Sequence, residues 1–88
     1  MATHDGLPVK GYMPQTDARV ALVNENKVLE ERVLRQIDRM QGKGNTSLDS
    51  SEYDQRMVAL ARTGVQDAFM WLNRAVFQPA RIDLPEDK

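Results

Sequence analysis

The sequence predicts an all-α protein, an antiparallel hairpin of two helices that follows an extended N-terminal arm and assembles into a homo-oligomer. Two long segments carry apolar residues at helical spacing, and a glycine-rich stretch over residues 41–47 separates them. The chain has 88 residues, no cysteine and one histidine, so we expect neither a disulfide nor a metal site to brace its small core. Association between subunits is the remaining way to stabilise it.

Charge and hydropathy argue against two classes of partner. Lysine and arginine number 12 against 13 acidic residues, whereas proteins that grip DNA or RNA duplexes rely on a basic surplus. No apolar run approaches the roughly 18 residues needed to cross a bilayer, and the first residues lack the basic and apolar regions of a signal peptide. We therefore expect a cytoplasmic protein without duplex or membrane partners.

The first 15 residues are expected to form the extended arm, because Pro8 and Pro14 bias the residues before them away from the helical region. The first helix is expected over residues 17–40, with Thr16 as its N-cap. Its apolar residues fall on one face at spacings that fit a helix and not a strand: Leu22, Leu29, Val33, Ile37 and Met40.

The second helix is expected over residues 50–78, between an Asp49–Glu52 capping box and Pro79. Its core stripe is expected at Met57, Ala61, Gly64, Ala68, Leu72 and Ala75. Another apolar stripe runs along a different side, through Val58, Val65, Phe69 and Val76. One hairpin covers one stripe of each helix, so the extra stripe predicts that hairpins pack together. The hairpin unit thus spans residues 16–79, and residues 80–88 form a polar tail.

Three residues are candidate ligand contacts, and each has a plainer interpretation. Arg62 interrupts the second apolar stripe. It is either an ion-paired arginine at a subunit interface or a guanidinium that binds phosphate in a pocket between subunits. Lys27, four residues after Val23, is either a surface lysine or a second phosphate contact. Tyr12 either packs or stacks on a base. These patterns alone leave both interpretations open for each residue.

Catalytic motifs are absent from the sequence. It contains no G-x-S-x-G, no P-loop, no H-E-x-x-H and no cysteine nucleophile. Acidic residues such as Glu25 and Glu30 alternate with basic ones at helix-surface spacing, which is typical of a solvated face. We therefore expect no enzymatic activity, no cofactor and no metal.

An ordered set of short stretches resembles one known family. The stretches are Gly11-Tyr12, residues 21–27, Leu60-Ala61-Arg62-Thr63, Phe69-Met70, Arg74-Ala75-Val76 and Pro79. With these stretches, the chain resembles the phage-encoded cyclic-oligonucleotide sponges that counter the bacterial CBASS defence, and their relatives that counter Thoeris. The resemblance covers residues 11–82. The short branch of that family is the better match, because the anti-Thoeris branch carries an additional β-rich portion.

The resemblance implies a homohexamer of helical hairpins that binds signalling nucleotides without cutting them, in the cytoplasm of an infected bacterium. It implies that Tyr12 stacks on a base of a cyclic dinucleotide and that Lys27, fifteen residues later, holds the phosphate. It also implies a second site for cyclic trinucleotides at Arg62. Leu29 stands where the family has a threonine that contributes to this second site.

Other functions remain as alternatives to a sponge. The leading one is a helical adaptor whose uncovered stripe binds a host protein. A transcriptional regulator would need a basic recognition helix and a short helix-turn-helix connection, which the sequence lacks. A nucleotide-degrading enzyme would turn over a cyclic dinucleotide when a divalent metal is added.

Overall fold

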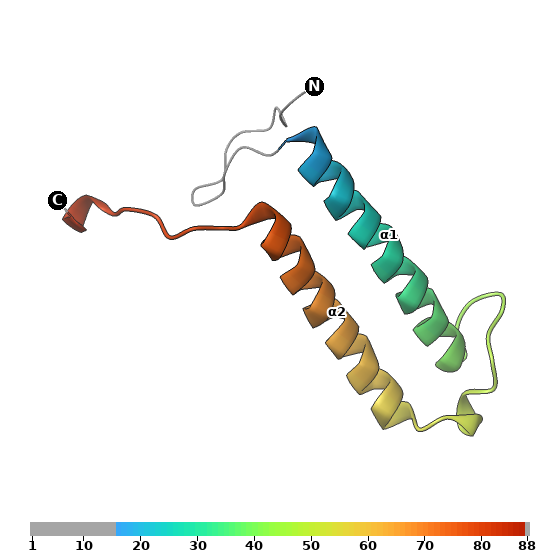
Figure 1. Cartoon of the computed structure of the whole chain (residues 1–88). Coiled ribbons are helices and arrows are strands. Elements are labelled where there is room, and N and C mark those ends of the chain that lie inside the picture. The colour runs from blue at the N-terminus through green and yellow to red at the C-terminus, as the bar shows by residue number, and fades with distance from the viewer. Residues whose placement is uncertain (1–15, 88) are drawn as a thin grey trace.

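The computed structural model describes residues 16–87, in which two antiparallel helices lie side by side (Figure 1). Helix α1 spans Asp17–Met40 and helix α2 spans Gln55–Phe77. Two short 3-10 turns, η1 at Ser50–Glu52 and η2 at Pro85–Asp87, lie outside the pair, and residues 16–87 contain no β-strand. The predicted all-helical hairpin is therefore confirmed. The predicted arm over residues 1–15 lies outside the described residues.

Helix α1 begins at its predicted cap. The hydroxyl of Thr16 accepts a hydrogen bond from the backbone N–H of Arg19 at 3.2 Å, which satisfies one of the free donors of the first turn. At the other end, Gly42 and Gly44 have φ of 77° and 84°, a region that glycine enters without steric cost. These two glycines allow the chain to leave α1 and turn back toward α2.

Helix α2 begins at Gln55, five residues after its predicted start. Asp49 does act as a cap, but of η1, where the hydroxyl and N–H of Ser51 donate to its carboxylate at 2.7 and 3.0 Å. These hydrogen bonds lower the pKa of Asp49. The chain becomes extended at Tyr53, and Asp54 then caps α2 by accepting from the N–H of Met57 at 3.0 Å. Two aspartates thus share the role that the sequence suggested for one.

Asp54→Ala is expected to lower the free energy of unfolding by about 1 kcal/mol, the usual effect of removing an N-cap. Asp49→Ala is the matched control, because it removes a cap of the same chemistry from a turn of three residues. Chemical denaturation followed by circular dichroism checks both variants. A larger loss in Asp49→Ala would show that the hairpin depends on η1 more than on the cap of α2.

Helix α2 ends where Gln78 adopts the left-handed conformation, with φ of 48° and its N–H donating to Arg74 O at 2.6 Å. Pro79 follows and cannot continue the helix. The guanidinium of Arg19 on α1 donates to Val76 O at 3.1 Å and so satisfies a carbonyl of the last turn of α2. The start of α1 and the end of α2 are thereby tied together.

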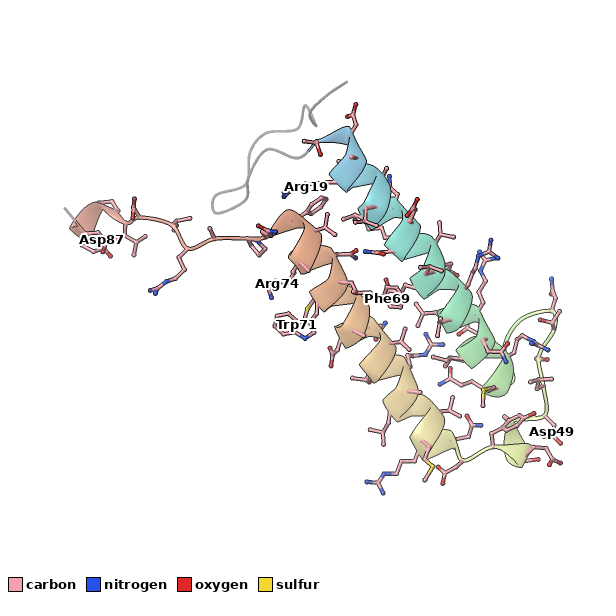
Figure 2. All side chains as sticks on the ribbon, viewed as in Figure 1. Arg19, Asp49, Phe69, Trp71, Arg74 and Asp87 are labelled. Carbon is pink, nitrogen blue, oxygen red and sulfur yellow. The ribbon has the colours of Figure 1, made fainter. Side chains whose placement is uncertain are left out.

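The two helices meet along a narrow apolar seam. Val23 and Ile37 from α1 and Val58 from α2 are buried, while Val65, Phe69 and Val76 are half-buried. Phe69 points toward α1, whereas Trp71 points away from it, beside Arg74 (Figure 2). Among the polar contacts between the helices, Asn26 Nδ2 donates to Asn73 Oδ1 at 3.2 Å within the seam and helps to fix the register.

The prediction of which α2 stripe forms the core is wrong. Its members are exposed, with Met57 at 68% and Leu72 at 49% of their full accessibility. The other stripe, of valines and phenylalanine, faces α1 instead, because branched and aromatic side chains remove more apolar area from water than alanine and glycine do. On α1, Ile37 is the one buried member of the predicted apolar set.

The exposed α2 stripe and the rest of the predicted α1 set, of which only Met40 is half-buried, form one surface that we call the apolar face. Successive residues of a helix are about 100° apart, which places the α1 set and the α2 set on the same side of the hairpin relative to the seam. Side chains from both sets also line one groove. The face comprises Leu22, Leu29, Val33 and Met40 of α1 and Met57, Ala61, Gly64, Ala68, Leu72 and Ala75 of α2. Neither helix within residues 16–87 has the length and apolar character needed to cross a membrane.

Candidate functional site

Lys27 is an exposed cation on the side of α1 away from the apolar face. Glu31, one turn further along, already binds Arg35 at 2.8 Å. Within residues 16–87, the ammonium of Lys27 has no hydrogen-bond or ion-pair partner and is free to meet an anion. Tyr12, its predicted companion, lies outside the described residues.

Arg62 is held inside the hairpin. Its side chain retains 28% of its accessibility and lies in the seam between Val58 and Val65. Nη2 donates to the carboxylate of Asp38 and, at 3.1 Å, to Gln41 Oε1, both of which belong to the end of α1. Arg62 is thus an ion-paired arginine between the two helices of one chain. The sequence had placed such a pair at a subunit interface.

Leu29 and the Arg62 contacts occupy different parts of the hairpin. Leu29 belongs to the apolar face and is 54% exposed. Asp38 follows it by nine residues, which places the two about 13 Å apart along α1 and about 180° apart around it. Leu29 and Arg62 therefore do not converge within one chain, and a site that used both would require more than one copy.

Asp38 and Gln41 are the residues that sequence reasoning missed at this site. No local motif marks them, because their partner lies more than twenty residues away on the other helix. The register of the hairpin indicates them, because residues that face one another in an antiparallel pair have residue numbers with a nearly constant sum. Asn26 with Asn73 and Asp38 with Arg62 give nearly the same sum. Once one interhelical pair is known in an antiparallel hairpin, the others follow.

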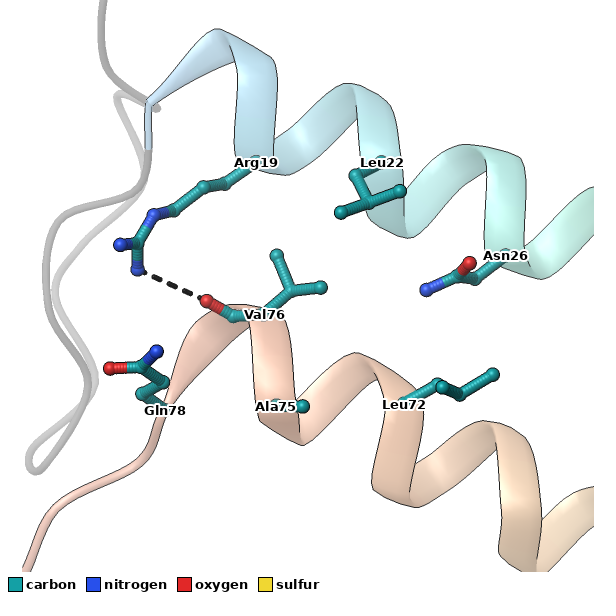
Figure 3. A pocket seen from close by; sticks show the side chains of 7 residues that line it. All are labelled: Arg19, Leu22, Asn26, Leu72, Ala75, Val76 and Gln78. Carbon is teal, nitrogen blue, oxygen red and sulfur yellow. Dashed lines mark hydrogen bonds between the residues drawn. The ribbon is translucent and has the colours of Figure 1, made fainter.

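An open groove lies at the end of the hairpin where α1 begins and α2 ends (Figure 3). It holds about 430 Å³ and is lined by Arg19, Leu22, Asn26, Leu72, Ala75, Val76 and Gln78. Its one charged side chain, Arg19, is engaged with Val76 O. The groove is a hollow in the apolar face, and its lining suits an apolar side chain better than a phosphate.

Residues 16–87 contain no cluster of three or more side chains that could hold a metal ion. Their ionisable side chains include Lys27 on α1, which has no partner within these residues, and Arg62 on α2, which is paired with Asp38. A small antiparallel pair of helices of this kind belongs to the class of helical hairpin domains.

Comparison with known proteins identifies the family within that class. The chain matches the Acb2/Tad1 hairpin domain over residues 6–77 and belongs to this family. It is also similar to Anti-CBASS protein 2 of Enterobacteria phage T4, with 32% identity over 80 residues that cover 81% of this chain and 91% of the relative. No solved structure matches the chain. The family resemblance predicted from the sequence is confirmed.

Proposed function

We propose that this protein is a phage anti-defence sponge, which binds cyclic dinucleotides, and cyclic trinucleotides at a second site, without cleaving them and so keeps CBASS effectors inactive in the infected cell. The observation that carries the proposal is the free ammonium of Lys27, at the position that the family resemblance assigns to phosphate binding. The similarity to a protein named for its action against CBASS supports the same conclusion.

The proposed mechanism is mass action. A sponge lowers the concentration of free messenger, so it must bind tightly and outnumber its ligand. A micromolar dissociation constant corresponds to about −8 kcal/mol and a nanomolar one to about −12 kcal/mol. Stacking contributes about 1–3 kcal/mol per base, and a charge-assisted hydrogen bond about 1.5–3 kcal/mol. Two copies of Tyr12 and Lys27 around one cyclic dinucleotide account for such affinities in a preformed site.

The proposed site therefore depends on assembly, and the apolar face supports assembly. Five large apolar side chains on this face are exposed, from 40% of full accessibility for Val33 to 68% for Met57. Contiguous exposed apolar patches mark surfaces that bind other molecules, and a second copy is the partner that is always available. We propose a homohexamer, the assembly that the family resemblance implies, with this face between subunits.

A calorimetric titration of cyclic di- and trinucleotides, followed by heat denaturation of the complex, tests the proposed function. We expect one cyclic dinucleotide for every two chains, and we expect chromatography to recover it intact from the denatured sample. Linear products would show a phosphodiesterase. Absence of any binding across the panel, combined with binding of a host protein, would favour the adaptor.

A further inference from the structure

Both contacts of Arg62 use the same nitrogen. Nη2 donates to the Asp38 carboxylate and, at 3.1 Å, to Gln41 Oε1. A guanidinium binds phosphate in a bidentate manner through one of two edges, Nη1 with Nη2 or Nε with Nη2, so Nη2 belongs to both. A phosphate that binds through either edge therefore competes with Asp38 and Gln41 for the same nitrogen.

The two acceptors differ in what they do to an incoming anion. Gln41 is neutral, so it can remain close to a phosphate that shares the guanidinium. Asp38 is an anion, and its repulsion of a phosphate adds to the loss of its own contact with Arg62. Lys27 forms no ion pair within residues 16–87, neither with Glu30 nor with Glu31, which is paired with Arg35. Asp38 therefore weakens anion binding at Arg62 and leaves anion binding at Lys27 unchanged.

We propose that Asp38 determines ligand specificity: by occupying Arg62, it weakens the binding of cyclic trinucleotides relative to cyclic dinucleotides. This inference rests on the proposed function, because it concerns the second of the two ligand classes. The pair is accessible enough to exchange partners, since the side chains of Arg62 and Asp38 keep 28% and 39% of their accessibility. Leu29 acts in the same direction, because its side chain offers no hydroxyl to a phosphate.

Asp38→Asn tests the proposal with cyclic triadenylate as the probe. The variant keeps the shape and an acceptor but removes the charge, and we expect binding to tighten about tenfold, the scale of one charge-assisted contact. Binding of a cyclic dinucleotide at Lys27 should change less than twofold, which also reports that the variant folds. Asp67→Asn, which removes the same charge from an exposed position of α2, should change neither affinity.

Two further variants keep the result interpretable. Asp38→Ala removes both the charge and the acceptor with a residue that favours helix, and it should tighten trinucleotide binding as Asp38→Asn does. Arg62→Ala in the Asp38→Asn background should abolish the gain, because the gain requires the released guanidinium.

The outcomes separate this inference from the proposed function. If neither Asp38 variant binds cyclic triadenylate more tightly than the parent, while dinucleotide binding is intact, the proposed role of Asp38 is wrong. The proposed function as a sponge is unaffected by that result. The same conclusion holds if neither the parent nor the variants bind the trinucleotide. A parent protein that binds no cyclic dinucleotide overturns the proposed function itself, whatever Asp38 does.

Discussion

Replacing Lys27 by alanine is expected to weaken cyclic dinucleotide binding by about 10- to 100-fold, the equivalent of one charge-assisted hydrogen bond. The ammonium has no partner within residues 16–87, so its removal leaves no stranded charge in the hairpin. Folding should therefore be unaffected. Tyr12→Ala should weaken binding by a comparable factor through the loss of base stacking. Isothermal titration of each variant against the same cyclic dinucleotide measures both effects.

Lys43→Ala is the matched control for this experiment. Lys43 is exposed in the turn after α1, and its replacement changes the net charge by the same amount as Lys27→Ala. Long-range attraction of an anionic ligand would fall equally in the two variants and would fade with added salt. A loss confined to Lys27→Ala identifies a direct contact. If Lys27→Ala and Tyr12→Ala both titrate like the parent, the proposed dinucleotide site is wrong.

The helices were predictable because their signals are local. Thr16 as N-cap and the glycines after α1 are recognised from a few neighbouring residues, and the structure confirms both. The start of α2 was placed early because two aspartates five residues apart have equal capping chemistry. Which one begins the long helix depends on the extended residue between them, Tyr53.

The seam was harder to predict because it depends on the choice between two apolar stripes of α2. Both stripes have helical spacing, so periodicity ranks them equally. Small residues such as Gly64 suggested close packing within the hairpin, yet the bulkier stripe around Phe69 faces α1. The pairing of Arg62 with Asp38 could not be predicted either, because it follows from a register that Asn26 and Asn73 fix only after folding.

Gly64→Leu is expected to break the proposed homo-oligomer into smaller species while leaving each hairpin helical. A Cβ added at Gly64 meets no atom of residues 16–87 within 4 Å, so a side chain that starts there enters open space in the hairpin. Leucine also favours helix over glycine by about 1 kcal/mol. In an assembly that packs on the apolar face, the same side chain would hold a neighbouring helix away from Ala61 and Ala68 and cost packing across the contact. Sedimentation and light scattering measure the mass, and circular dichroism measures the helix content.

Ala59→Leu is the control for this experiment, because Ala59 is also exposed on α2 but lies about 140° around the helix from Gly64. It adds a comparable apolar side chain outside the apolar face and should leave the mass unchanged. Dissociation by Ala59→Leu alone would place the subunit contact on the other flank of the hairpin. Since the dinucleotide site is proposed to lie between subunits, Gly64→Leu should also lose ligand, although it alters neither Lys27 nor Tyr12. A dissociated Gly64→Leu protein that still binds cyclic dinucleotide as tightly as the parent would show that one chain is a complete site.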